Sequence, residues 1–262
     1  MRKSLLLLMA AGALVAMVAT GVAVGAGNNK PVKVIVGDLE VEGNGIFKPS
    51  VVSKTKLTPV GVTISGAIRK VGGGHPPALK ELVVETDKNG TVDVEGYPTC
   101  PPGKIQSTNT KAARAACGPA IIGEGTTEVG IFFPDQGNEV QVKSDLLMFN
   151  SGVKGGVTTL LVHAYITVPV PAAIVTTVKI KKIHKGRYGL LSVASIPKIA
   201  GGSGSVKSFS LKIDKKFTYK GKKHSVLNLK CPDGKIQIRS EAIFAEGPTA
   251  SLEFVRPCTG RN

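Results

Sequence analysis

Histidine is the side chain best suited to proton transfer near neutral pH, and the chain has only four: His75, His163, His184 and His224. We interpret His75, which precedes two prolines, as a loop residue, and His184 and His224, which lie in basic stretches, as surface residues. His163 shares the polar face of an expected strand with Tyr165. We expect a hydrogen-bonded histidine of a sheet there. The alternative is a secreted hydrolase with an unrecognised site near His163.

Other motifs that carry chemistry are missing from the sequence. HExxH, GxSxG and a nucleophilic cysteine motif do not occur. The glycine clusters at 72–74, 152–156 and 201–204 lack the GxxxxGK[ST] spacing, so we expect turns rather than phosphate loops. The Asp87-Lys-Asn-Gly sequence lacks the remaining ligands of a calcium loop. We therefore expect no enzyme, and no catalytic residue, cofactor or metal site.

The four cysteines are an even number and favour disulfides. Three pairings are possible, and the one local in sequence joins Cys100 to Cys117 and Cys231 to Cys258. A zinc site is the alternative, but CxxC pairs and a suitably spaced histidine are absent. We expect one disulfide in each half of the chain.

Positive charge is concentrated in the second half. Residues 27–140 contain 12 Lys/Arg and 12 Asp/Glu, whereas residues 141–262 contain 20 Lys/Arg and 6 Asp/Glu, a net charge of +14. Two basic clusters are the candidate binding residues for anionic polymers: Lys179, Lys181, Lys182, Lys185, Arg187, Lys212, Lys215, Lys216, Lys220, Lys222 and Lys223.

Lysine suits diffuse attraction to a polyanion rather than geometric recognition of one anion. Anionic cell-wall polymers or acidic polysaccharide are the partners we consider, and a merely solubilising surface is the alternative. A specific nucleic-acid partner is disfavoured, because the basic clusters contain few aromatic side chains for base stacking. The oligomeric state is left open.

The elements that must position these residues are mostly strands. Apolar residues alternate with smaller or polar ones around Val62 and Ile64, and again along 157–168. Asn89-Gly90 and Asp233-Gly234 each predict a hairpin turn between two strands. A short helix is expected near 108–117, capped by Thr108 or Thr110.

Landmarks that recur about 130 residues apart indicate an internal duplication. Cys100-Pro-Pro-Gly-Lys-Ile-Gln recurs as Cys231-Pro-Asp-Gly-Lys-Ile-Gln, and an Ala-Ile-x-x-Glu-Gly stretch follows each copy. We expect a near-neutral first β half, 27–138, and a strongly basic second β half, 139–262. The segment 134–138 is the candidate linker between them.

The N-terminus has the pattern of an export signal. Arg2 and Lys3 precede an uncharged apolar run, and Val24-Gly25-Ala26 provides small residues for cleavage. We expect residues 1–26 to be a cleaved signal peptide, with an uncleaved membrane anchor as the alternative. After cleavage, no transmembrane segment is expected.

Several segments together resemble a family of uncharacterised exported proteins of high-GC Gram-positive soil bacteria. These are His75 to Lys80, Asp87 to Thr91, Phe149 to Gly156, Ile183 to Gly189 and Ile196 to Gly204. The resemblance covers most of the chain from about Leu57 to Cys258. It implies an extracytoplasmic location and brings no activity, substrate or site residues.

The sequence therefore predicts an all-β, disulfide-containing basic protein of two β-sandwich-like halves with one short inserted helix. We expect it to be secreted or held in the cell envelope. The expected function is a non-enzymatic binding or structural module that contacts anionic envelope or extracellular polymers.

Overall fold

The computed structural model describes residues 21–26 and 29–261. Most of the predicted signal peptide, residues 1–20, lies outside the described residues. The strands are β1 (Gly21–Ala26), β2 (Val32–Val36), β3 (Leu39–Lys48), β4 (Val51–Ser53), β5 (Thr58–Pro59), β6 (Gly61–Lys70), β7 (Leu79–Asp87), β8 (Gly90–Val92), β9 (Ile121–Phe133), β10 (Asn138–Lys154), β11 (Val157–Ile166), β12 (Ala172–Lys185), β13 (Tyr188–Ser195), β14 (Gly204–Ile213), β15 (Lys216–Tyr219), β16 (Lys222–Ser225), β17 (Leu227–Leu229), β18 (Lys235–Phe244), β19 (Ala250–Pro257) and β20 (Thr259–Arg261). The helix α1 spans Thr110–Cys117, and short 3-10 turns span Pro102–Lys104, Gly118–Ala120, Pro134–Gln136 and Ala200–Gly202.

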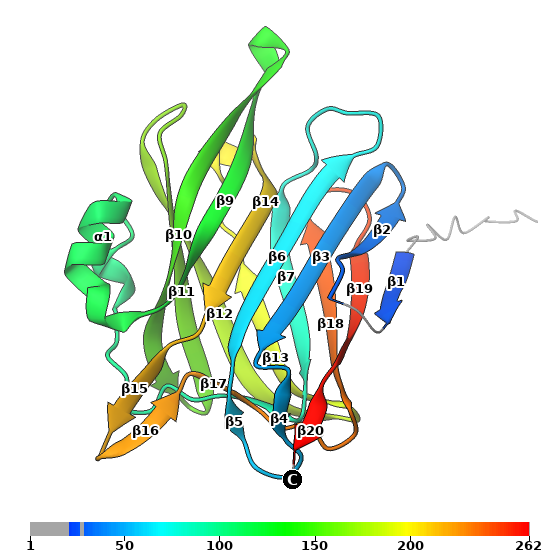
Figure 1. Ribbon diagram of the computed structural model, residues 1–262. Helices are drawn as coiled ribbons and strands as arrows, with labels where there is room; N and C mark the ends of the chain where they lie inside the picture. The colour runs from blue at the N-terminus through cyan, green and yellow to red at the C-terminus, as the bar shows by residue number, and fades with distance from the viewer. Residues whose placement is uncertain (1–20, 27–28, 262) are drawn as a thin grey trace, which may run out of the picture.

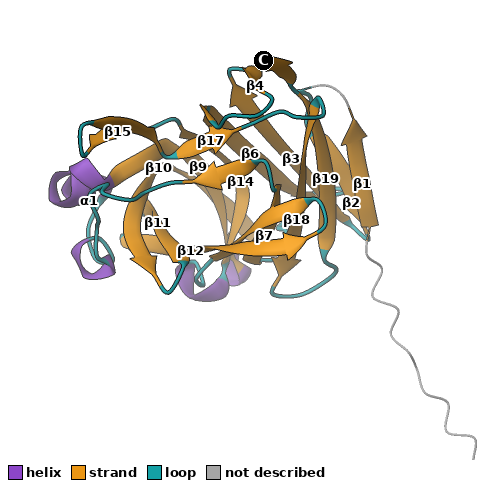
Figure 2. Ribbon diagram, turned by 90° about the horizontal axis from the view of Figure 1, so that it is seen from below, coloured by secondary structure: helices purple, strands orange, loops and turns teal. Residues whose placement is uncertain are grey.

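One large sheet contains thirteen of the described strands, in the order β1-β19-β18-β7-β13-β12-β11-β10-β9-β14-β6-β3-β2. Neighbours are antiparallel except β1 and β19, which are parallel. The two ends of this order lie against each other, because β2 contacts both β1 and β19. The sheet is therefore rolled up, with its strands arranged around an interior (Figures 1 and 2).

Alternating burial along the strands explains the roll. In β2, Val32, Val34 and Val36 are buried while Lys33 and Ile35 are exposed. Residues of one parity face inward along each strand, so the apolar set of every strand meets the others inside. The resulting core has one part formed mainly by β2, β3, β7, β18 and β19, and a second part formed mainly by the six strands β9, β10, β11, β12, β13 and β14.

Small elements close the lower end of the roll as drawn in Figure 1. The strands β5, β17 and β8 form a three-stranded sheet, and β15 pairs with β16. The parallel pair β4 and β20 lies beside them. Cys231–Cys258, with a Cα–Cα distance of 6.1 Å, ties this end to the C-terminal strands.

A flap formed by residues 98–120, with α1 at its centre, covers the outer face of β10 and β11. Cys100–Cys117 closes it, with a Cα–Cα distance of 5.6 Å. The buried Asn150 of β10 fixes the start of the flap, donating its side-chain amide to the carbonyl oxygens of Tyr97 and Pro98. Both expected disulfides and the single short helix are thus confirmed.

Three local predictions were wrong. The strand that follows Asn89-Gly90, β8, pairs with β17 instead of returning along β7. Likewise, β17 and β18, on either side of Asp233-Gly234, belong to different sheets. The cap of α1 is Asn109, whose side-chain oxygen accepts from the Ala112 N–H at 2.9 Å. Asparagine is as good a cap as threonine, and local pattern alone did not distinguish them.

The all-β class is confirmed, whereas the duplication is not. Cys100 begins the outer flap, while Cys231 lies in the turn before β18. Strands of 27–138 and of 139–262 also pair with each other, as β7 does with both β13 and β18. The segment 134–138 joins the paired strands β9 and β10. The duplication and the division at residue 138 therefore stay predictions.

Candidate functional site: an apolar cavity inside the rolled sheet

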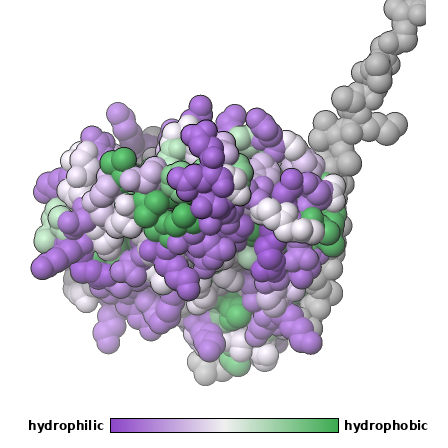
Figure 3. All heavy atoms as spheres, turned by 90° about the horizontal axis from the view of Figure 1, so that it is seen from above, coloured by the Kyte–Doolittle hydropathy of each residue, from purple (hydrophilic) through white to green (hydrophobic). Residues whose placement is uncertain are grey.

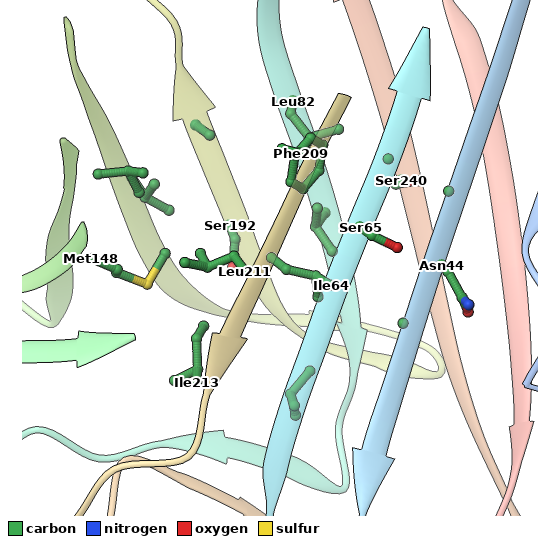
Figure 4. A pocket seen from close by; sticks show the side chains of 18 of the residues that line it. Asn44, Ile64, Ser65, Leu82, Met148, Ser192, Phe209, Leu211, Ile213 and Ser240 are labelled. Atoms are coloured by element: carbon green, nitrogen blue, oxygen red, sulfur yellow. The ribbon is translucent and has the colours of Figure 1, made fainter. Parts of the chain in front are cut away.

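The interior of the roll contains a cavity of about 400 Å³. Its walls come from β3, β6, β7, β9 to β14, β18 and β19, and from the small lower sheet. Figure 4 shows Ile64, Phe209 and Leu211 on the near wall, with Leu82 and Ser192 behind them. The lining is almost entirely aliphatic. A cavity of this size and character falls within the range of sites for small ligands.

Two glycines at inward positions make room for large rings in the cavity wall. Gly43 of β3 and Gly66 of β6 are cross-strand partners. A side chain at Gly43 would collide with the ring of Phe254, at 2.9 Å, and one at Gly66 with the ring of Phe209, at 2.7 Å. The two glycines therefore admit two rings that lean over them from neighbouring or facing strands.

Two of the polar residues that line the cavity lie close together on the far wall. Ser192 of β13 and Ser240 of β18 both lie opposite Val84 of the intervening β7. Both serines line the cavity, and the residues two positions before and after each of them, which also line it, are aliphatic. Within the part of the chain that the structure describes, neither hydroxyl has a hydrogen-bond partner. They are available to a polar group of a ligand.

The upper end of the roll is crossed by residues 71–78, the connection from β6 to β7, which we call the strap. Its central residue, His75, has its Nδ1 atom 2.5 Å from Glu139 Oε2 and its Nε2 atom 3.0 Å from Ser205 Oγ. Burial alone would raise the pKa of the Glu139 carboxyl. The hydrogen bonds from Lys207 and His75 outweigh burial and hold that pKa below its ordinary value.

Serine, histidine and carboxylate in this order resemble the triad of hydrolases, but the geometry anchors a loop. Ser205 is 1% exposed. Its hydroxyl donates to the Pro76 carbonyl oxygen at 2.6 Å, the shorter of its two contacts. A nucleophile needs a reachable oxygen, so the arrangement supports fastening of the strap rather than catalysis. Sequence reasoning missed this group, because its members are 64 and 130 residues apart.

His163 lies elsewhere, beneath the flap. It is 0% exposed, and its Nε2 lies 2.8 Å from the carbonyl oxygen of Thr108. Burial lowers the pKa of this imidazole, against the opposing effect of the Thr108 bond. Tyr165 instead lines a separate, more open pocket with Asp145 and Glu128. The two residues therefore do not share an accessible pocket, and their placement gives no support to the hydrolase alternative.

The predicted lysines lie on the outer surface near the lower end. Lys179, Lys181 and Lys182 are exposed on β12. The exposed lysines of the β15–β16 hairpin and the residue before it form a second group: Lys215, Lys216, Lys220, Lys222 and Lys223. Among the described residues, none of these eight forms an ion pair within 4.0 Å.

The remaining three predicted cations have partners. Lys185 pairs with Glu85 at 2.8 Å and Lys212 with Asp214 at 2.5 Å. Arg187 contacts Asp233 and also Asp87, which is fully buried. The hydrogen bonds that Arg187 donates to Asp233 and then to Asp87 raise its pKa. Arg187 thus joins three turns at the lower end.

Comparison with known proteins gives no relative: no family model, curated protein or solved structure matches the chain. Among the described residues, no helix has the length and apolar character to cross a membrane. The same residues contain no cluster of three or more His, Cys, Asp or Glu suited to a metal ion. The site is thus defined by its own geometry.

Proposed function

We propose that the protein is an exported, non-enzymatic binding module that holds an aliphatic, lipid-like ligand inside the rolled sheet. The observation that carries this proposal is the cavity of about 400 Å³ with its almost wholly aliphatic wall. Protein interiors are normally packed as densely as organic crystals. An empty apolar cavity of this size costs on the order of several kcal/mol, which a bound ligand would offset.

The composition of the wall supports an aliphatic ligand. Isoleucine, leucine and valine dominate, aromatic rings are few, and the chain contains no tryptophan. Aromatic ligands usually meet aromatic side chains, whereas hydrocarbon chains need only an apolar volume. Ser192 and Ser240 would accept or donate one hydrogen bond each to a hydroxyl or carbonyl group of the ligand.

An extracytoplasmic location supports the same proposal. Two disulfides are compatible with an oxidising compartment, and the N-terminal pattern and the family resemblance both favour export. A protein outside the cytoplasm that carries an apolar molecule shields it from water. The fold needs no second protein for that task.

Titration with cis-parinaric acid, a fatty acid that fluoresces in apolar surroundings, tests the proposal. We expect saturable binding, and Ser192→Leu should weaken it at least tenfold, because leucine would occupy ligand space. Ser195→Leu on the same strand is the matched control, since Ser195 is exposed. Absence of saturable binding to the purified protein would refute the proposal.

A second function is favoured by a separate observation, the eight exposed lysines without ion pairs. We propose that they attract anionic wall polymers or acidic polysaccharide to the lower end. Such attraction between exposed charges weakens as salt rises, because the Debye length falls from about 10 Å at 0.1 M to about 3 Å at 1 M. It needs no defined pocket and is independent of the cavity.

Co-sedimentation with cell-wall sacculi across a salt series tests this second function. Binding should fade with salt and with removal of the anionic polymers. Replacing Lys216, Lys220, Lys222 and Lys223 by glutamine should reduce it severalfold. The charge-matched control replaces four exposed lysines elsewhere: Lys104, Lys111, Lys143 and Lys198. Equal loss in both variants would mean that net charge alone matters.

A further inference from the structure

The strap must cross the upper end of the roll because of the sheet order. β6 lies between β14 and β3, whereas β7 lies between β13 and β18. Residues 71–78 connect these two parts of the wall, and Figure 1 shows the connection at the upper end. Ile68, just before the strap, and Leu79, just after it, both line the cavity. The strap thus spans one end of the roll, and the residues on either side of it belong to the wall of the ligand site.

The first part of the strap contains three consecutive glycines, whose backbone can change conformation easily. Gly72, Gly73 and Gly74 have φ values of +84°, +93° and +95°. No other atom lies within 4 Å of a side chain built at Gly72 or Gly73. Three consecutive glycines, two of them in open space and all in a conformation that other residues rarely adopt, form a segment of high conformational freedom. Pro76 and Pro77 follow and stiffen the second part.

One group of side chains, the clasp, fastens the strap at the joint between these parts. His75 contacts Glu139 and Ser205, and its ring stacks on Phe132 with a centroid distance of 5.6 Å. Lys207, whose Nζ lies 2.9 Å from Glu139 Oε1, orients the carboxylate. The clasp therefore consists of contacts made by the strap to β9, β10 and β14.

The upper end also presents hydrophobic residues among hydrophilic ones. Figure 3, viewed from above, shows a hydrophobic group near the middle of this face. Val71, the first residue of the strap, is 54% exposed, and Val170, after β11, is 68% exposed. An apolar ligand that approaches this end would meet apolar surface on the strap, at Val71, and beside it, at Val170.

The lower end is closed in a different way. Paired strands β5, β17 and β8 cover it. The Cys231–Cys258 disulfide and the contacts of Arg187 with Asp87 and Asp233 bind the neighbouring turns together. Opening there would break strand pairing or buried ion pairs, whereas lifting the middle of the strap would break the clasp and the hydrogen bond from Ser205 to the Pro76 carbonyl oxygen.

We propose that the strap is the gate through which the ligand enters and leaves the cavity, and that the His75 clasp holds this gate shut. The inference rests on the proposed function of the cavity. Loss of the clasp would raise the fraction of time that the gate is open. Ligand association and dissociation would then both accelerate, while the equilibrium affinity would change little because the cavity wall is untouched.

Stopped-flow mixing of the full protein with cis-parinaric acid tests the gate. His75→Ala should raise both the association and dissociation rates at least fivefold, with the equilibrium Kd within threefold of the original. Ser205→Ala should act in the same direction and more weakly. His184→Ala, a change at an exposed histidine of β12, is the matched control and should leave the rates unchanged.

The outcomes separate the two proposals. Binding with unchanged rates in a folded His75→Ala variant overturns the gate and leaves the binding function standing. No binding by the original protein overturns both. If His75→Ala unfolds the whole protein, amide hydrogen exchange of a milder variant tests the gate instead. His75→Gln, which retains a donor toward Glu139, would then replace it, with faster exchange expected at the Val71 and Gly73 amides and unchanged exchange in β18. Unchanged exchange in the strap would overturn the gate.

Discussion

Arg256 of β19 donates its guanidinium Nε–H to the carbonyl oxygen of Gly45 on β3 at 2.8 Å. The two residues are 211 positions apart in sequence, and they meet at the seam where the ends of the rolled sheet come together. Arg256 is 1% exposed and also donates to the carbonyl oxygen of Lys30 and to Asn44 Oδ1. Burial lowers the pKa of its guanidinium. The seam is thus bonded through a side chain.

Replacing Arg256 by methionine should destabilise the protein by about 2–4 kcal/mol. The change keeps an apolar stem but leaves the carbonyl oxygen of the buried Gly45 at the seam without this donor. Urea unfolding measures the effect. Arg69→Met is the control, since Arg69 bonds Glu40 and Glu42 at the exposed surface and should cost less than about 1 kcal/mol. Equal losses of unfolding free energy in the two variants would show that the hydrogen bonds at the seam contribute no more than surface ion pairs do.

A larger side chain placed in the cavity should stabilise the ligand-free protein against unfolding. In Ser192→Leu, the added carbon atoms would occupy empty apolar space, with an expected gain of roughly 1–2 kcal/mol in the free energy of unfolding. Ser195→Leu on the outer face should change stability by less than about 0.5 kcal/mol. Thermal unfolding of both variants checks the prediction. A destabilised Ser192→Leu would mean that the interior has no room for the larger side chain.

Removing the flap disulfide should weaken folding locally and globally. The bridge between Cys100 and Cys117 spans 17 residues, and the chain-entropy model assigns about 3 kcal/mol to a loop of this length. Replacing both cysteines by alanine should lower stability by that amount. Amide exchange should accelerate most in α1, while β18, on another part of the sheet, should change only through the global loss. Uniform acceleration would indicate that the flap does not open separately.

Acid should destabilise the protein partly through His163. Its pKa is lowered in the folded state, mainly by burial, while the unfolded imidazole titrates near its ordinary value of about 6.5. As pH falls below that value, the unfolded chain takes up a proton that the folded chain does not, so stability falls. Stability above pH 7 is unaffected by this group.

Urea unfolding of His163→Gln at pH 7.5 and pH 5.0 isolates this contribution. The variant should lose less stability between the two pH values than the original protein does, whatever its stability at pH 7.5. Identical losses would contradict the assignment. His184→Gln, at an exposed site, is the control and should retain the full pH dependence.

Features that depend on short stretches of chain were predictable. Alternation revealed the strand at 157–166, and the even cysteine count with local spacing pointed to the observed pairing. Strand partners were harder: the turn at Asn89-Gly90 exists, but β8 leaves β7 for β17, 135 or more residues away. The residues of a turn determine that the chain reverses there, but they do not determine which strand the next segment pairs with.

The candidate site could not be predicted for a related reason. The cavity is enclosed by side chains from many strands that are distant in sequence, among them Ser192 and Ser240. Space that large side chains leave unfilled in the interior produces no local pattern in a sequence. The clasp joins His75, Glu139 and Ser205 from three separate segments, and the interpretation of His75 as a loop residue was correct but incomplete.

The parallel strand β1, Gly21–Ala26, belongs to the predicted signal peptide and pairs along the whole of Gly21 to Ala26 with Ala250 to Val255 of β19. A peptidase that cuts after Ala26 would therefore remove a strand together with the export signal. The backbone groups of β19 on that side would lose their partners, and an open edge of this kind accepts a further strand. Maturation would then change what the sheet can recruit: the precursor caps its own edge, and the processed chain offers that edge to another polypeptide.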